Sequence, residues 1–340
     1  MLRSLQNVVV PAGAILVVAL SGCSQKGSSR VAAATSNAST SSNASAKGKS
    51  VVYIAPSTNG FYVQANCGAK QVADAAGVNY SVQYAKNFTA ADETPLINAA
   101  VASKPAAIIV SAADTKALNV PLRQAALQGI KVITVANGIS DNSFLTSAVQ
   151  GDNEANGKKA ADLLAKLAAG KSGEVAYIAY TPGGSAVTDA RRKGFEAQIK
   201  KYSNLKLISP TVLSGLAATD GAAATNAVLS AHPDLLGIVG SYVPVANGMA
   251  TALKERGAVG KVIALQMDAD PAGVEDVKAG TLQGLTAEAT RQEGQDAMTQ
   301  AINAITGKKV DKSVTSNPVV FTKDNASSPD MQQYISKTTC

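Results

Sequence analysis

A loop near the start of the chain places an amide and two aromatic rings where a ligand could meet them. The apolar run 51–55 predicts a β-strand, and a helix-period pattern that ends at Gly77 predicts a helix behind it. Ligands bind outside the carboxyl ends of strands in a parallel sheet, so this loop is expected to form a first ligand wall. Its residues are Ser57, Asn59, Phe61 and Tyr62. The loop lacks the glycine and lysine patterns of nucleotide-binding loops, so it does not predict a phosphate cradle.

Other polar and aromatic residues stand at or near the ends of later predicted strands. They are Asp114, Asn137, Tyr180, Asp189, Tyr242, Asp268 and Glu288. Carboxylates and amides hydrogen-bond hydroxyl groups, while aromatic rings stack on apolar ring faces. Structural alternatives stay open: Asp268 could cap a turn, Phe61 and Tyr62 could belong to the core, and Asp189 could be a solvated helix residue.

The elements that must position these residues alternate regularly between strand and helix. Such alternation predicts right-handed βαβ units on parallel sheets with helices on both faces. At residues 150–153 a second series of alternating helices and strands begins, with Asp152 or Asn153 as the cap of a helix over 154–169. The second series includes one strand expected over 206–212. Two series in tandem predict an α/β fold of two doubly wound parallel-sheet lobes with a cleft between them.

Several short motifs stand in a fixed order along the chain. They are Ser57-Thr58-Asn59-Gly60-Phe61-Tyr62, Gly68-Ala69, Asp152-Asn153, Lys193-Gly194-Phe195, Ala231-His232-Pro233-Asp234, Asp268 and Lys278-Ala279-Gly280. Together they resemble the ribose-type periplasmic sugar-binding proteins, which are type I solute-binding proteins of ABC importers. The likeness runs from about residue 51 to about residue 320.

The resemblance implies the type I periplasmic binding fold, in which the chain crosses three times between two lobes. It assigns residues 50–151 and 288–316 to an N-terminal lobe and residues 152–287 and 317–328 to a C-terminal lobe. Residues 329–340 remain as a tail that could be pinned to the N-terminal lobe. Multiple crossings suit a hinge that closes around a ligand.

The ligand that the resemblance implies is a small polar molecule, a sugar or a polyol. The residues expected to bind it are Asn59, Phe61, Tyr62, Asn137, Tyr242, Asp268 and Glu288. Asp268 stands where the family has a sugar-binding aspartate. Ala136-Asn137 replaces the family's usual Asp-Arg pair, and the family's arginine near Asp189 is matched only by a shift to Arg191 or Arg192. Without an assured cation the pocket is expected to be net acidic, which suits a neutral polyol, an amino sugar or another nitrogen-bearing solute.

Composition and motifs argue against several other classes of protein. With 46% hydrophobic and 16% charged residues the chain has an ordinary globular composition. The formal charge of +7 is dispersed without a basic run, so nucleic-acid binding is not expected. His232 is the single histidine, no residue cluster has metal-ligand spacing, and no G-x-S-x-G motif is present. We therefore expect neither an enzyme nor a bound metal or other cofactor.

The first 49 residues predict export and attachment to a membrane. Arg3 precedes an apolar stretch over residues 8–20, and Leu20-Ser21-Gly22-Cys23 resembles a bacterial lipobox. The prediction is a lipoprotein signal peptide over residues 1–22, a lipid on Cys23 and a flexible tether over residues 23–49, rich in Ser and Ala. An ordinary signal peptide or a single membrane anchor is the alternative.

Two further cysteines, Cys67 and Cys340, are a disulfide candidate in an oxidising compartment. Such a bridge would clamp the tail onto the first lobe, and some lipid-anchored relatives share this pair. Two free buried thiols are the alternative.

These observations predict an extracytoplasmic solute-binding lipoprotein that delivers its ligand to the permease subunits of an ABC importer. We expect a monomer. Alternatives are a ligand-binding co-receptor for a chemotaxis or sensor-kinase system and a secreted enzyme on the same fold.

Overall fold

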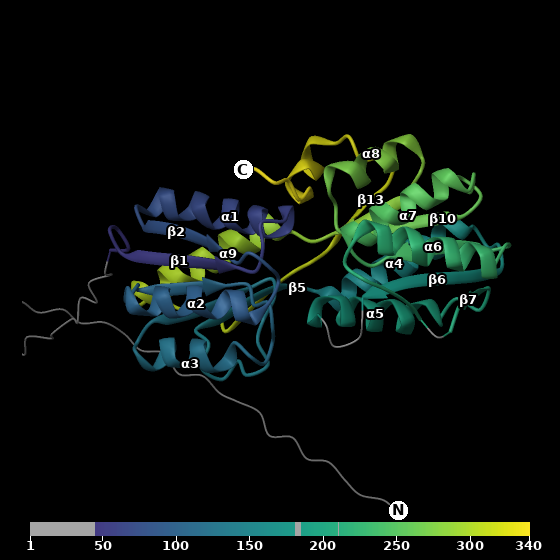
Figure 1. Cartoon of the computed structure of the whole chain (residues 1–340). Coiled ribbons are helices and arrows are strands. Elements are labelled where there is room, and N and C mark those ends of the chain that lie inside the picture. The colour runs from purple at the N-terminus through teal and green to yellow at the C-terminus, as the bar shows by residue number, and fades with distance from the viewer. Residues whose placement is uncertain (1–44, 181–184, 210) are drawn as a thin grey trace, which may run out of the picture. The chain divides into compact units, whose positions relative to one another are not determined.

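Two β-sheets with helices on both faces dominate the described part of the chain (Figure 1). The computed structural model describes residues 45–180, 185–209 and 211–340. The predicted signal peptide, Cys23 and all but the last residues of the predicted tether lie outside these described residues. Among the described residues, no helix is long and apolar enough to cross a membrane.

The first sheet has six parallel strands, and we call it, with its helices, the first lobe. In sheet order the strands are β12 (Ser313–Ser316), β5 (Ser147–Gly151), β4 (Lys131–Val135), β3 (Ala107–Val110), β1 (Ser50–Ala55) and β2 (Asn79–Tyr84). Its helices are α1 (Gly60–Ala76), α2 (Ala90–Ala102), α3 (Asn119–Leu127) and α9 (Thr290–Ile305).

Side chains of β1 point alternately to the two faces of this sheet. Val51 and Tyr53 pack with α1 and α9, whereas Val52 and Ile54 pack with α2 and α3. All four are buried, as the continuous apolar run of a strand covered on both faces requires. The helices therefore hold the strand ends of this lobe in fixed positions.

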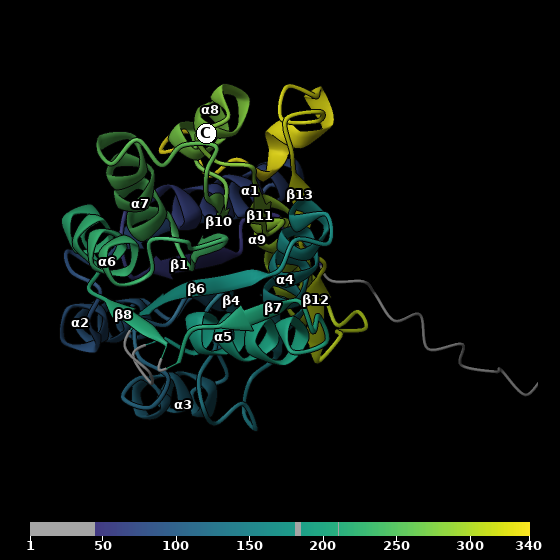
Figure 2. The ribbon, with the colours of Figure 1, turned by 90° about the vertical axis from the view of Figure 1, so that its right-hand side faces the viewer.

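The second sheet, with its helices, forms the second lobe (Figure 2). Its strands in sheet order are β13 (Val319–Phe321), β11 (Gly284–Ala287), β10 (Ile263–Met267), β9 (Gly237–Gly240), β6 (Gly173–Tyr180) and β7 (Leu205–Leu207), and β8 (Val212–Ser214) also pairs with β6. Its helices are α4 (Asn153–Ala168), α5 (Ala186–Ile199), α6 (Ala218–Ala231), α7 (Val243–Glu255) and α8 (Pro271–Ala279). The core on one face involves α4 and α5, and the core on the other face involves α6, α7 and α8.

The α/β fold class predicted from the sequence is confirmed, with two differences in detail. The strand expected over 206–212 is two short strands, β7 and β8, which pair with different parts of β6. Strand β13 runs antiparallel to β11, whereas the other strand pairs of the described sheets are parallel.

The chain passes between the two sheets at three places. It leaves the first sheet after β5, returns to it after β11, and leaves it again between β12 and β13. As a result, α9 packs beside α1, from which it is more than 200 residues distant in sequence. Gly68 and Gly294 permit this close approach, since a Cβ on either would collide with backbone of the other helix.

The last residues of the sequence touch both lobes. A 3-10 helix (Pro329–Tyr334) leads to Ile335, which pairs with Ala269 of the second lobe. Five residues later, Cys340 is disulfide-bonded to Cys67 in α1, with the two Cα atoms 5.4 Å apart.

Candidate ligand-binding site

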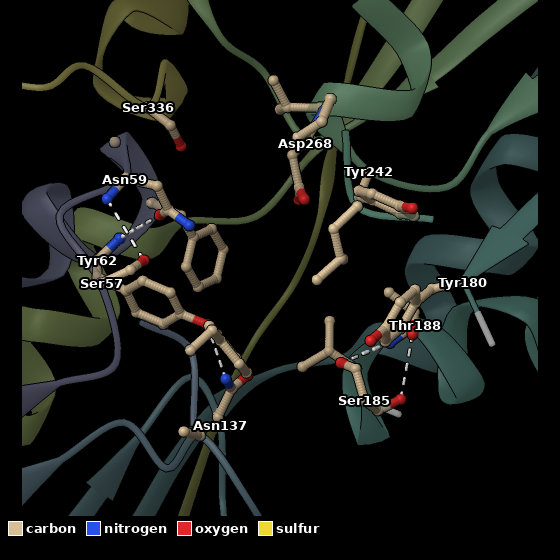
Figure 3. Close-up of a pocket in the computed structure, with 18 of the residues that line it drawn as sticks. Ser57, Asn59, Tyr62, Asn137, Tyr180, Ser185, Thr188, Tyr242, Asp268 and Ser336 are labelled. Atoms are coloured by element: carbon tan, nitrogen blue, oxygen red, sulfur yellow. Dashed lines mark hydrogen bonds between the residues drawn. The ribbon is translucent and has the colours of Figure 1, made fainter. Parts of the chain in front are cut away.

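A cavity of about 610 Å³ lies where the loops of the two lobes face each other (Figure 3). Most of its lining residues lie at or beyond the carboxyl ends of parallel strands, where α/β sheets bind ligands. The first lobe contributes Ser57, Asn59, Gly60, Phe61, Tyr62, Phe88, Thr89, Ala90, Ala113, Asp114 and Asn137. The second lobe contributes Tyr180, Ser185, Val187, Thr188, Arg191, Leu216, Tyr242, Val243, Pro244, Asp268 and Asp270, and the tail adds Ser336.

The first-lobe wall is built from aromatic rings fixed by amides. Asn59 caps α1, its Oδ1 accepting a hydrogen bond from the backbone N–H of Tyr62 at 3.3 Å. Asn137, just beyond β4, donates from Nδ2 to the Tyr62 hydroxyl at 2.7 Å. Phe61 and Phe88 flank the Tyr62 ring, with ring centroids 5.3 and 6.0 Å away. Burial raises the pKa of Tyr62, so this hydroxyl is a neutral donor.

The second-lobe wall centres on a carboxylate held by a buried arginine. Asp268 follows β10, and Arg191 of α5 donates to both of its carboxylate oxygens at 2.7 Å each. Arg191 also donates to Asn153, to the backbone oxygen of Ser241 and to Glu288. These bonds use all five guanidinium N–H groups. Arg191 therefore fixes the Asp268 carboxylate and keeps no donor for a ligand.

Two tyrosines complete this wall. Tyr180 ends β6, Tyr242 precedes α7, and their rings meet edge to face with centroids 6.1 Å apart. The Tyr242 hydroxyl donates to the backbone oxygen of Gly215. Its hydrogen bond holds the ring in place at the cavity wall.

Glu288 requires a correction, because it does not line the cavity. Its side chain is 1% exposed and lies behind Arg191, whose Nη2 donates to Glu288 Oε1 at 2.7 Å. Burial raises the pKa of Glu288, with the nearby Arg191 acting in the opposite direction. Gly151 leaves the room for this side chain, since a Cβ there would lie 2.8 Å from the carboxylate. Glu288 is therefore a partner of Arg191 and not a ligand contact.

The premise that the pocket has no assured cation is wrong. Arg191 lines the cavity, and it is only 1% exposed. Asp268 and Glu288 outweigh the opposing effect of burial and raise the pKa of Arg191 above its ordinary value, so it stays charged. With Asp114 and Asp270 as well as Asp268, the lining still carries more negative than positive charge.

Asp114 and Asp270 are already engaged by the backbone. Asp114 accepts hydrogen bonds from the N–H groups of Lys116 and Ala117, which lower its pKa, and Asp270 caps α8. Asp189 lies outside the cavity and forms an ion pair with Arg192 at 3.6 Å. Asp268 is consequently the lining carboxylate best placed to meet a ligand.

Of the residues predicted to bind the ligand, six line the cavity: Asn59, Phe61, Tyr62, Asn137, Tyr242 and Asp268. Sequence reasoning missed Phe88, which follows β2 and could have been found by the same strand-end rule. The sequence offers Arg191 only as a possible match to the family's arginine, because the strand-end rule does not select a residue inside a helix. No sequence pattern marks Ser336 as a residue of the cavity lining.

Groups that would suggest other chemistry are not found in the described residues. No cluster of three or more His, Cys, Asp or Glu side chains there could hold a metal ion. His232 lies outside the cavity and pairs with Glu174 through Nδ1 at 2.6 Å.

Comparison with known proteins identifies similar proteins of one family. A family model described as a periplasmic binding protein domain matches residues 51–309. The ribose import binding protein of Salmonella typhimurium is 27% identical over 282 residues, covering 82% of this chain and 92% of that protein.

Solved structures show the same fold. A solute-binding protein from Agrobacterium vitis, bound with alpha-D-tagatopyranose, superposes with a TM-score of 0.79 at 27% identity, covering 85% of this chain and 99% of the other. One from Agrobacterium radiobacter, in complex with D-arabinose, gives a TM-score of 0.77 at 27% identity over 84% and 98% of the two chains. The chain therefore belongs to the periplasmic binding protein family, in its ribose-type group of ABC-importer solute-binding proteins, which act outside the cytoplasm and are not enzymes.

Proposed function

We propose that this protein captures a neutral monosaccharide or polyol between its lobes and delivers it to the permease of an ABC importer. The observation that carries the proposal is the Asp268 carboxylate, which Arg191 holds at both oxygens on the cavity wall. A carboxylate fixed in this way can still accept hydrogen bonds from two ligand hydroxyls.

The opposite wall suits the apolar face of a sugar ring. Phe61, Tyr62 and Phe88 are clustered there, and Tyr180 and Tyr242 face them from the second lobe (Figure 3). Rings on two sides and a hydroxyl acceptor between them are the features that sugars require. The relatives named above bind ribose, tagatopyranose or arabinose according to their descriptions, which supports a neutral monosaccharide.

The excess of negative charge in the lining argues against an acidic ligand. It leaves one alternative ligand class, an amino sugar or another nitrogen-bearing solute, which Asp268 could bind as a charge partner. A function as co-receptor in a sensing system would use the same site and the same binding chemistry.

The first test is a thermal-shift screen of the purified protein against neutral sugars, polyols, amino sugars, nucleosides and amino acids. Specific binding raises the melting temperature by mass action. A shift with neutral sugars or polyols is the expected result. A shift confined to cationic solutes would overturn the sugar assignment, and no shift with any class would overturn the binding function.

The proposal includes a lipid on Cys23 that keeps the protein at the membrane. We expect metabolic labelling with a fatty acid to mark the wild-type protein and not Cys23→Ser, with Cys67→Ser as the matched control that is still labelled. Labelling of Cys23→Ser would contradict the anchor.

A further inference from the structure

Residues 335–340, which we call the strap, connect the two lobes beside the cavity. Within six residues the strap contacts the second lobe at Ala269 and the first lobe at Gln64 and Cys67. The strap is separate from the three passages of the chain that join the sheets, because it follows all of them in sequence.

On the second lobe the strap is held next to Asp268. Ile335 is 5% exposed and packs in the same core cluster as Ala269. The backbone N–H of Ser336 donates to the Ala269 oxygen at 2.7 Å. The first residues of the strap are therefore fixed to Ala269, the residue that follows Asp268 at the end of β10.

On the first lobe the strap is held against α1. Gln64 Nε2 donates to the backbone oxygens of Lys337 and Thr339 at 3.0 and 2.9 Å, and the disulfide fixes Cys340 to Cys67. The approach is close, since a Cβ on Gly60 would lie 2.4 Å from the backbone oxygen of Ser336. A residue without a side chain at the start of α1 makes room for the strap.

Between these two attachments Ser336 lines the cavity (Figure 3). We propose that the strap is a third wall of the ligand site, in which the Ser336 hydroxyl hydrogen-bonds the bound ligand and the Cys67–Cys340 disulfide holds it in position. The inference rests on the proposed function, since it assigns one more contact to the same ligand.

The hydroxyl of Ser336 differs from the other polar groups of the site because its position depends on both lobes. Asp268 and Asn137 are each fixed within one lobe. Freed from Cys67, the end of the strap would regain conformational freedom, and ordering it again on binding would cost affinity. Ser336 therefore makes ligand affinity depend on the disulfide.

The test is calorimetric titration of the full chain, purified in a detergent without a sugar head group, with D-ribose, D-arabinose and D-tagatose. For the sugar that binds most tightly, Ser336→Ala is expected to weaken affinity about five- to tenfold, as the loss of one hydrogen bond does. Cys340→Ser is expected to weaken it by about threefold or more. Thr338→Val is the matched control, because it removes a hydroxyl from an exposed strap residue that does not line the cavity, and its affinity should equal that of the wild type.

Monodeoxy analogues of that sugar identify the contact itself. The analogue that lacks the hydroxyl bound by Ser336 should bind the wild type and Ser336→Ala with equal affinity, whereas the other analogues should still distinguish them. Wild-type affinity in Ser336→Ala, which keeps the disulfide, would overturn the inference while leaving the proposed function intact. A wild-type protein that binds neither these three sugars nor any other neutral sugar or polyol of the thermal-shift screen would overturn both.

Discussion

The two lobes share a backbone conformation at one strand end but use it for different chemistry. Ala136 after β4 and Asp268 after β10 both have positive φ, at 62° and 68°. Only Asp268 carries a polar side chain, which Arg191 fixes. In the first lobe that position offers a methyl group, and the next residue, Asn137, binds Tyr62 instead.

Two buried carboxylates, Glu288 in the passage between the lobes and Glu93 in the first lobe, also differ in their partners. Glu288 has Arg191 as a partner, whereas Glu93 in α2 has no cation bonded to it in the described part of the chain. The second lobe thus contributes the carboxylate that Arg191 holds, together with two tyrosine rings. The first lobe contributes aromatic rings and neutral amides, and its one lining carboxylate among the described residues, Asp114, is bound by backbone N–H groups. A ligand with hydroxyls on one side and an apolar face on the other suits this division.

Removal of the fixed charge should have the largest effect on binding. In Asp268→Ala we expect affinity for the bound sugar to fall at least a hundredfold, since a charged hydrogen-bond acceptor is lost from the site. Arg191 keeps Glu288 as a partner, so the fold should persist. Calorimetric titration measures the loss, and thermal unfolding with Asp268→Asn as a second variant checks the fold. Unchanged affinity in both variants would show that the site is misplaced.

Glu93, a buried first-lobe carboxylate without a bonded cation in the described part of the chain, should make stability depend on pH. Burial raises the pKa of Glu93 to about 8 from an ordinary value of 4.5, although the Ala113 N–H opposes this. The folded protein therefore holds this proton more tightly than the unfolded chain does. The stabilisation is complete below about pH 4.5 and is lost as the pH rises through about 8.

Glu93→Gln removes this titrating group. The free energy of unfolding of the wild type should decrease between pH 5 and pH 8.5, and we expect this decrease to be smaller by roughly 1–3 kcal/mol in Glu93→Gln. Urea denaturation at several pH values measures it. Glu293, whose pKa burial also raises to about 8, should keep part of the slope. The exposed Glu255→Gln is the control, and an equal flattening there would contradict the assignment to Glu93.

Loss of the neutral amide of the first lobe should cost less affinity than loss of the charge. Asn137→Ala removes the hydrogen bond that positions Tyr62, and we expect a three- to tenfold loss of affinity by the same titration. Tyr62→Phe removes the hydroxyl that accepts this hydrogen bond, and its loss of affinity should equal that of Asn137→Ala within a factor of about two. A loss as large as that of Asp268→Ala would contradict the division of chemistry between the lobes.

The smallest effect concerns the strand end that carries no functional group. Positive φ costs an alanine more than a glycine, so Ala136→Gly should stabilise the protein by up to about 1 kcal/mol without a change in affinity. Ala165→Gly in helix α4 is the opposing control and should lose about 1 kcal/mol. Urea denaturation measures both, and a destabilised Ala136→Gly would contradict the argument from backbone strain.

The sequence predicts the fold class and six residues of the cavity lining because both follow from local patterns. Runs of apolar residues give the strands, and Asn59, Tyr62 and Asp268 follow from the rule that ligands meet strand ends. Arg191 and Glu288 are the exceptions: the rule does not reach Arg191, and it wrongly selects Glu288, which follows β11 but is buried behind Arg191. Arg191 lies within a helix, and the burial of Glu288 behind the cavity wall depends on how α5 packs.

The strap shows the same limit more strongly. Only the Cys67–Cys340 pair pointed to the tail, and a disulfide between two cysteines says nothing about the four residues before it. Ser336 reaches the cavity through the pairing of Ile335 with Ala269, which is a tertiary contact without a periodic signature.

The three passages of the chain between the sheets also constrain the order in which the lobes can be completed. The second lobe is almost continuous in sequence; after residue 287 it lacks β13 and the residues that follow it, of which Ala326 and Ile335 join its core. The first lobe begins earlier in the chain but needs α9 and β12, which come more than 130 residues after β5. Contacts of such long sequence separation form slowly, so we expect the lobe that is synthesised first to be the lobe that is finished last.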